Sequence, residues 1–126
     1  MPGARILLVE DEYLVRLILA EALVDAGFAV TEADGGVEAV RMLDGPSRFD
    51  LLITDVQMPP PDGIAVAQHA RARCPDMPIV FATARPDSTR AFKGRREFHA
   101  VVAKPYAPEQ MLAAVRGILA AGSGAP

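Results

Sequence analysis

Short apolar runs alternate along the chain with longer segments whose apolar residues recur every three or four positions. The runs have the length and character of strands, and they cover residues 6–9, 28–32, 51–53, 78–81 and 101–103. The longer segments predict helices over residues 12–26, 37–43, 64–73 and 109–119. Strands that alternate with helices indicate βαβ units, and therefore an α/β fold built on a parallel sheet.

The stretch between the fourth and fifth strands has a weaker helical pattern. Residues 85–97 should hold a fourth helix, but Phe92 is the only large apolar residue among them. Pro86 and Gly94 bracket roughly two turns, and Ser88 is one candidate for the N-cap. We therefore expect a short or mobile helix here.

The length of 126 residues predicts one domain, which we place at residues 1–121 with a flexible tail at 122–126. Apolar residues make up 51% of the chain, and the net charge of −3 argues against non-specific nucleic-acid binding. Cys74 is the single cysteine, which excludes an internal disulfide and a cysteine-based zinc site. The sequence has neither a membrane-length apolar run nor a secretory signal pattern, so we expect a cytoplasmic protein.

Acidic residues stand where two of the predicted strands end. Glu10 and Asp11 follow the first strand, and Asp55 follows the third. In a parallel sheet these ends line up along one edge, so the three carboxylates should meet there. Like charges at close range are unfavourable unless a cation joins them, and Mg²⁺ suits oxygen ligands of this kind. The backbone carbonyl of Gln57, after Asp55, is the candidate for a further oxygen ligand.

Two other strand ends carry groups suited to a phosphoryl group. Thr83 ends the fourth strand with a hydroxyl, and Lys104 follows the fifth with an ammonium group. With the acids and a metal, this is a set for phosphoryl transfer in which Asp55 attacks phosphorus and forms an acyl phosphate. Lys104 would neutralise charge on the transferred group, and Thr83 would donate a hydrogen bond to it.

Each of these residues also has an ordinary structural explanation. Asp11 could cap the first helix and Asp62 the third. Lys104 alone would be a solvated lysine, and Thr83 alone a turn residue. The functional interpretation depends on the whole set, because matched side chains at several strand ends are hard to obtain by chance.

The same residues resemble the receiver domain of two-component response regulators, of the stand-alone type, from Arg5 to about Leu119. The acidic pair after the opening strand matches the family, as do Asp55 with the following Asp62-Gly63, Thr83-Ala84 and Lys104-Pro105. The resemblance implies a doubly wound, flavodoxin-like sheet of five parallel strands flanked by five helices.

The resemblance also implies roles for the residues. Asp55 would accept a phosphoryl group from a phosphohistidine on a sensor histidine kinase or a histidine phosphotransfer protein. Mg²⁺ would be held by Asp11, Asp55 and the Gln57 carbonyl, and by Glu10 through water. Thr83 and Lys104 would contact the phosphoryl group, and the bond from Lys104 to Pro105 would be cis.

The chain departs from the family at the position three residues before the lysine. The family usually has Tyr or Phe there, which moves inward with the threonine, whereas this chain has Val101. A valine has no ring to move inward with the threonine, so the usual coupling of threonine to an aromatic ring lacks its aromatic partner at this position.

Candidates for partner docking are the basic residues near Thr83 and an aromatic residue after the fifth strand: Arg85, Arg90, Lys93 and Tyr106. A solvated basic surface is the alternative explanation for the three cations.

The leading hypothesis is thus a signalling switch, not an enzyme, that works through protein contacts without a DNA-binding output domain, as a monomer or a phosphorylation-linked homodimer. A phosphate shuttle or sink, or a receiver excised from a hybrid histidine kinase, stays open as an alternative. A magnesium-dependent phosphohydrolase, a flavin- or nucleotide-binding module and a scaffold without phosphorylation are less favoured. The chain contains neither G-x-G-x-x-G nor G-x-x-x-x-G-K-[ST].

Overall fold

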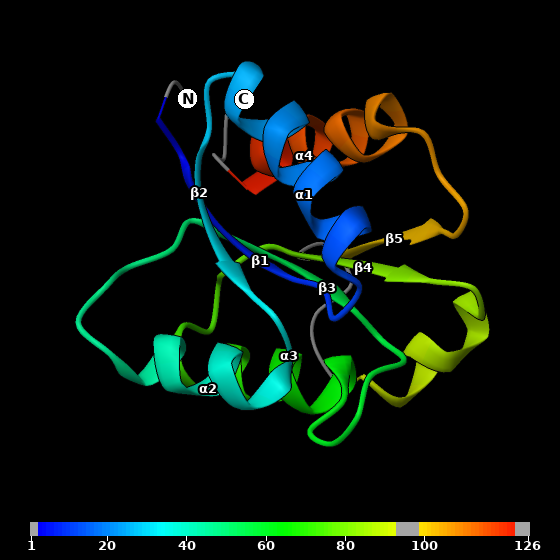
Figure 1. Ribbon diagram of the computed structural model, residues 1–126. Coiled ribbons are helices and arrows are strands. Elements are labelled where there is room, and N and C mark those ends of the chain that lie inside the picture. The colour runs from blue at the N-terminus through cyan, green and yellow to red at the C-terminus, as the bar shows by residue number, and fades with distance from the viewer. Residues whose placement is uncertain (1–2, 93–98, 123–126) are drawn as a thin grey trace.

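The strands pair into one parallel sheet in the computed structural model, which describes residues 3–92 and 99–122 (Figure 1). The strand order is β2-β1-β3-β4-β5, and every neighbouring pair is parallel. The predicted parallel sheet is therefore confirmed. The strands are β1 (Arg5–Val9), β2 (Ala29–Ala33), β3 (Leu51–Asp55), β4 (Ile79–Thr83) and β5 (His99–Ala103).

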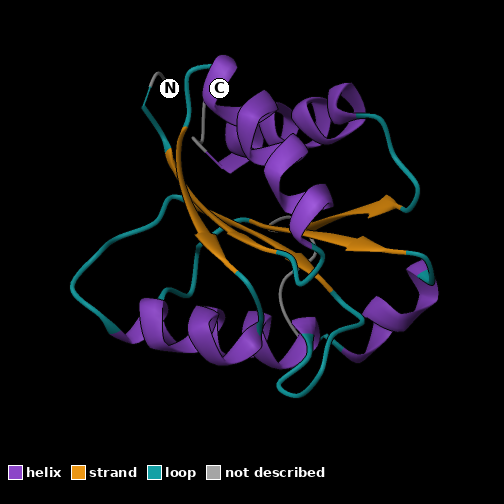
Figure 2. Ribbon diagram, in the orientation of Figure 1, coloured by secondary structure: helices purple, strands orange, loops and turns teal. Residues whose placement is uncertain are grey.

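Helices cover both faces of this sheet. Figure 2 shows α1 (Tyr13–Asp25) and α4 (Pro108–Gly122) on one face, and α2 (Gly36–Asp44) and α3 (Gly63–Arg73) on the other. Two separate apolar cores result, and alternate residues of each central strand enter one or the other. Leu8 belongs to the core under α1 and α4, and Leu7 to the core under α2 and α3. This burial on both faces explains why the central strands are continuously apolar.

The expectation of five flanking helices is wrong for the described residues, which contain four α-helices and a 3₁₀ helix, η1 (Pro86–Ala91), in the fourth position. Ser88 Oγ donates to the Arg85 carbonyl at 2.6 Å, and Thr89 Oγ1 donates to the Pro86 carbonyl at 2.8 Å. These side chains occupy carbonyls that an α-helix would use, which favours a short turn. The predicted shortness is confirmed, and the segment from residue 93 to 98 lies outside the described residues.

Element ends differ from the apolar runs by a few residues. β5 begins at His99 because that residue pairs with Ile79 of β4, although it is not part of the apolar run. α4 extends to Gly122, past the predicted end at residue 119. The rest of the predicted tail, residues 123–126, is outside the described part of the chain. None of the described helices is both long and apolar enough to cross a bilayer.

The central strands β1 and β3 lie side by side, and their chains continue to opposite faces of the sheet. The chain leaves β1 towards α1 on one face and leaves β3 towards α3 on the other (Figure 1). Divergence of this kind opens a crevice at the carboxyl ends of the two strands. Glu10 and Asp55 stand at those ends, which places them at the crevice.

Candidate functional site

The predicted acidic residues come together at the crevice. Carboxylate oxygens of Glu10, Asp11 and Asp55 all lie within 4.8 Å of one another. Glu10 is 3% exposed and Asp55 is 6% exposed, whereas Asp11 lies at the surface. Partial burial, followed by the neighbouring Glu10 carboxylate, raises the pKa of Asp11. Three oxygen donors that crowd in this way, open to solvent on one side, fit a hard divalent cation such as Mg²⁺.

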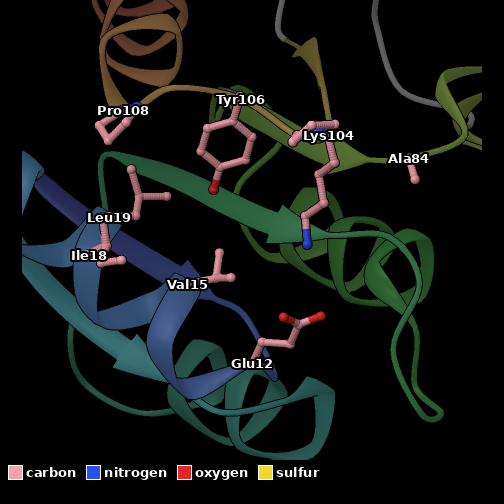
Figure 3. A pocket seen from close by; sticks show the side chains of 9 residues that line it. Glu12, Val15, Ile18, Leu19, Ala84, Lys104, Tyr106 and Pro108 are labelled. Atoms are coloured by element: carbon pink, nitrogen blue, oxygen red, sulfur yellow. The ribbon is translucent and has the colours of Figure 1, made fainter.

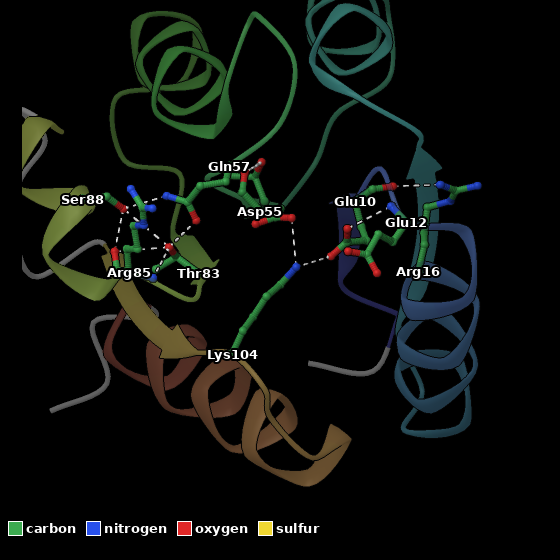
Figure 4. A network of polar contacts seen from close by, with 10 residues as sticks. Glu10, Glu12, Arg16, Asp55, Gln57, Thr83, Arg85, Ser88 and Lys104 are labelled. Carbon is green, nitrogen blue, oxygen red and sulfur yellow. Dashed lines mark hydrogen bonds and ion pairs between the residues drawn. The ribbon is translucent and has the colours of Figure 1, made fainter.

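Lys104 lies between the two buried acids. Its Nζ donates to Glu10 Oε1 and to Asp55 Oδ2, each at 2.9 Å (Figure 4). Burial disfavours the charged ammonium, but the bonds to Asp55 and Glu10 outweigh this effect and raise the lysine pKa. The ammonium therefore stays charged at neutral pH and offsets one of the negative charges. Negative charge remains for a cation to neutralise, because three carboxylates gather around one ammonium group.

The Glu10 segment is fixed by further hydrogen bonds. The backbone N–H of Glu12 donates to Glu10 Oε2 at 3.0 Å, and Arg16 Nη1 donates to the Glu10 carbonyl at 2.8 Å. Arg16 also pairs with Glu32 of β2 at 3.2 Å. The first turn of α1 and the edge strand thus both hold the acidic loop. The N-cap of α1 is Glu12, so the alternative role of Asp11 as the cap of this helix is wrong.

The backbone of Asp55 is held by the start of α3. Thr54 Oγ1 donates to the Asp55 carbonyl at 2.9 Å, and Gly63 N–H donates to the Val56 carbonyl at 2.9 Å. Gly63 packs so closely that a Cβ there would run into the Asp55 carbonyl oxygen. Asp62 caps α3 by accepting from the Ala65 N–H at 2.9 Å, which confirms the structural role considered for Asp62. These contacts from β3 and from the start of α3 fix the backbone of Asp55, from which its side chain projects.

Thr83 is fully buried at the end of β4, and its hydrogen bonds lead away from the acids. Thr83 Oγ1 donates to Gln57 Oε1 at 2.6 Å and accepts from the Arg85 N–H at 2.9 Å. Gln57 Nε2 continues to Ser88 Oγ at 3.1 Å. Figure 4 shows this group beside Asp55, on the side facing η1.

Comparison with known proteins identifies the family. The model of the response regulator receiver domain matches residues 6–116. The chain belongs to this family. The response regulator MprA of Mycobacterium leprae is 37% identical over 116 residues, which cover 91% of this chain and 50% of that protein. The chain thus spans about half the length of the curated relatives it matches.

Solved receiver structures share the fold. A response regulator receiver protein from Sinorhizobium medicae superposes with a TM-score of 0.88 at 33% identity, covering 95% of this chain and 97% of that one. The receiver domain of the hybrid histidine kinase CckA gives 0.77 at 31%, covering 92% and 99%. A receiver domain of a Pseudomonas aeruginosa sensor histidine kinase gives 0.80 at 26%, covering 94% and 98%, and that structure has a magnesium ion coordinated in its active-site cleft.

This receiver domain also has a cavity of about 350 Å³ between α1 and the loop after β5 (Figure 3). Apolar side chains of α1, including Val15 and Ile18, line one side, and Lys104 and Tyr106 line another. Burial, followed by the charge of Glu10, raises the pKa of Tyr106 to about 12. The aromatic ring thus covers one flank of the charged site.

The remaining residues predicted from the sequence are placed as follows. The bond from Lys104 to Pro105 is cis, and a second cis bond, from Pro60 to Pro61, was not anticipated. Arg85 and Arg90 are exposed, whereas Lys93 lies outside the described residues.

The side chains of Gln57 and Ser88 were not predicted as neighbours of Thr83. Of Gln57 only the backbone carbonyl was predicted to contribute, as a metal ligand, and Ser88 was predicted only as a candidate helix cap. The spacing of Ser88 from Arg85 is compatible with a side-chain bond to that carbonyl, but no feature of the sequence pairs Ser88 with Gln57.

Proposed function

We propose that Asp55 of this receiver domain accepts a phosphoryl group from a phosphohistidine on a sensor kinase or a histidine phosphotransfer protein. The observation that supports the proposal most strongly is the position of Asp55, buried among two acids and one lysine at the edge of the sheet. Membership of the family and the relatives in kinases point the same way. MprA and its relatives are longer proteins, and action of this chain through protein contacts without a DNA-binding output domain stays a prediction.

The transfer follows from the groups present. Lys104 holds Oδ2 of Asp55, so we assign the attack on phosphorus to Oδ1. An O–P bond forms while the P–N bond of phosphohistidine breaks, and the electron pair of the P–N bond stays on the imidazole nitrogen. Lys104 then faces the added negative charge, and the Thr83 hydroxyl can donate to a phosphoryl oxygen.

Glu10, Asp11 and Asp55, with the Gln57 carbonyl, would hold the magnesium ion, with Glu10 acting through water. When bound, Mg²⁺ neutralises charge on the oxygens of the transferred group. The donor set fits this ion because carboxylates gather there in excess of the one ammonium group. We do not assign the chain an enzymatic activity beyond slow loss of its own phosphoryl group.

Incubation with acetyl phosphate and Mg²⁺ tests the proposal. We expect a magnesium-dependent adduct of one phosphoryl group in the wild type and none in Asp55→Asn. Asp62→Asn is the matched control, because Asn caps a helix about as well as Asp and Asp62 is not among the three clustered acids. Labelling of Asp55→Asn at the wild-type level would move the phosphoacceptor elsewhere, and steady turnover of a phosphomonoester would favour the hydrolase alternative.

Partner docking through Arg85, Arg90, Lys93 and Tyr106 stays a proposal. The backbone N–H of Arg85 donates to the Thr83 hydroxyl at 2.9 Å, so movement of that hydroxyl at the phosphoryl site would alter the position of Arg85. A pull-down by phosphorylated kinase with Arg85→Ser and Arg90→Ser tests this. Unchanged capture by both variants would exclude these two residues from the docking face. The monomer or phosphorylation-linked dimer and the cytoplasmic location are likewise predictions.

A further inference from the structure

The hydrogen bonds around Thr83 form a closed ring with Gln57, Ser88 and Arg85, which we call the Thr83 network (Figure 4). Gln57 comes from the loop after β3, Thr83 from the end of β4, and Ser88 from η1. The network therefore ties the phosphoacceptor loop to the only short helix of the described chain. It lies beside the site, since Ala82, which precedes Thr83, pairs with Asp55 in the sheet.

Counting protons fixes the direction of the bonds. Ser88 has one hydroxyl proton, which goes to the Arg85 carbonyl at 2.6 Å, so Ser88 Oγ accepts from the Gln57 amide nitrogen at 3.1 Å. The amide oxygen of Gln57 is then left facing Thr83. An amide oxygen can only accept, so the Thr83 hydroxyl is the donor in the 2.6 Å bond to Gln57 Oε1. The Arg85 carbonyl, 3.2 Å from Thr83 Oγ1, is a second and more distant acceptor for the same proton, while Oγ1 itself accepts from the Arg85 N–H at 2.9 Å.

Competition for one proton follows. A threonine hydroxyl has one proton to donate, and the nearest acceptor, Gln57 Oε1 at 2.6 Å, and the more distant Arg85 carbonyl at 3.2 Å both compete for it with a phosphoryl oxygen on Asp55. The bond to Gln57 must break for Thr83 to contact the phosphoryl group. Its loss also leaves the Gln57 amide with only its bond to Ser88 in η1.

We propose that Gln57 and Ser88 are positioning residues for Thr83: they hold its hydroxyl proton away from Asp55 before phosphorylation, and they pass its release on to η1. The inference rests on the proposed function of Asp55. It supplies a route for the signal in a chain where Val101, 39% exposed, stands at a position usually aromatic in the family.

Binding of beryllofluoride with Mg²⁺, a stable stand-in for the phosphoryl group, measures this competition. Gln57→Met keeps the length of the side chain but removes the nearer acceptor, so Thr83 gives up only the longer contact with the Arg85 carbonyl. The net contribution of one hydrogen bond corresponds to about a fivefold change in affinity, so the variant should bind the mimic about fivefold more tightly. Gln68→Met, on α3, is the matched control and should bind like the wild type.

A double-mutant cycle separates this effect from general loosening of the loop. In a Thr83→Val background there is no hydroxyl proton to compete for, so adding Gln57→Met should leave the affinity unchanged. Ser88→Ala should give a smaller gain than Gln57→Met, because it removes only the bond that orients the amide. Thermal unfolding of each variant in the absence of the mimic verifies that it is folded.

Amide hydrogen exchange of residues 88–91 gives a second readout. In the wild type the mimic should speed exchange in η1. In Gln57→Met exchange should already be fast without the mimic and should change little when it is added.

The inference is overturned if Gln57→Met leaves the affinity unchanged or weakens it, or if it tightens binding equally in the Thr83→Val background. In those cases Asp55-dependent binding of the mimic would still support the proposed function. If the wild type fails to bind the mimic, or Asp55→Asn binds it as well as the wild type, the proposed function and this inference fail together.

Discussion

Replacing Lys104 by Met tests the charge balance of the site most severely. The substitution keeps an unbranched side chain in place of the lysine stem but removes the ammonium that bonds Glu10 and Asp55, each at 2.9 Å. Both acids are more than nine-tenths buried, so water replaces the lost bonds poorly. Breaking a buried ion pair by removing one partner costs about 3–5 kcal/mol. Because the Lys104 side chain is 20% exposed, we expect a loss at or below the lower end, about 2–3 kcal/mol.

Urea unfolding with and without Mg²⁺ is the assay. In EDTA, Lys104→Met should unfold at lower urea than the wild type with an unchanged slope. A saturating cation that binds only the folded state contributes about 2.7 kcal/mol at a hundred times its dissociation constant. Without the competing ammonium the cation should bind more tightly, so Mg²⁺ should stabilise the variant more than the wild type. Arg116→Met removes an exposed positive charge and is the control.

Two results would refute this reasoning. One is a Lys104→Met variant as stable as the wild type in EDTA, which would mean that the acids do not need the ammonium. The other is an equal gain from Mg²⁺ in both proteins, which would mean that the cation binds elsewhere.

Three further predictions concern the surroundings of the site. Gly63→Ala should destabilise the fold by about 1–3 kcal/mol and slow phosphorylation, because its Cβ meets a backbone carbonyl, whereas Gly117→Ala, with open space around it, should be neutral or stabilising in urea unfolding. The pKa of Tyr106 is about 12 in the folded protein and about 10 in the unfolded chain, so the unfolded state loses its proton first. The free energy of unfolding should therefore fall between pH 10 and 12, and the fall should be smaller in Tyr106→Phe. Arg16→Met should weaken Mg²⁺ binding several-fold in calorimetry by freeing the Glu10 loop, and unchanged affinity would contradict this role.

The acids and the lysine could be predicted from the sequence because a parallel sheet brings strand ends to one edge. Glu10, Asp55 and Lys104 each follow an apolar run, and that rule places them together without knowledge of any side-chain conformation. The strands could be recognised in the sequence as continuous apolar runs, because both faces of the central strands are buried.

The Thr83 network could not be predicted in the same way. It depends on the rotamers of Gln57 and Ser88, which belong to a loop and a 3₁₀ helix with no apolar periodicity. Pro86 and the scarcity of apolar residues predicted only that the fourth helix is weak. The hydroxyls of Ser88 and Thr89 donate to backbone carbonyls and so compete with helical hydrogen bonds. The spacing of apolar residues carries no information about this local competition.

Locating the phosphoryl group on the chain tests the central claim most directly. Borohydride reduces an acyl phosphate of aspartate to homoserine, which peptide mass spectrometry places in the sequence. After treatment with phosphoramidate, whose P–N bond resembles that of phosphohistidine, we predict homoserine at position 55 in the presence of Mg²⁺ and none in its absence. Homoserine at Asp11 instead, or equal modification with and without Mg²⁺, would contradict the account.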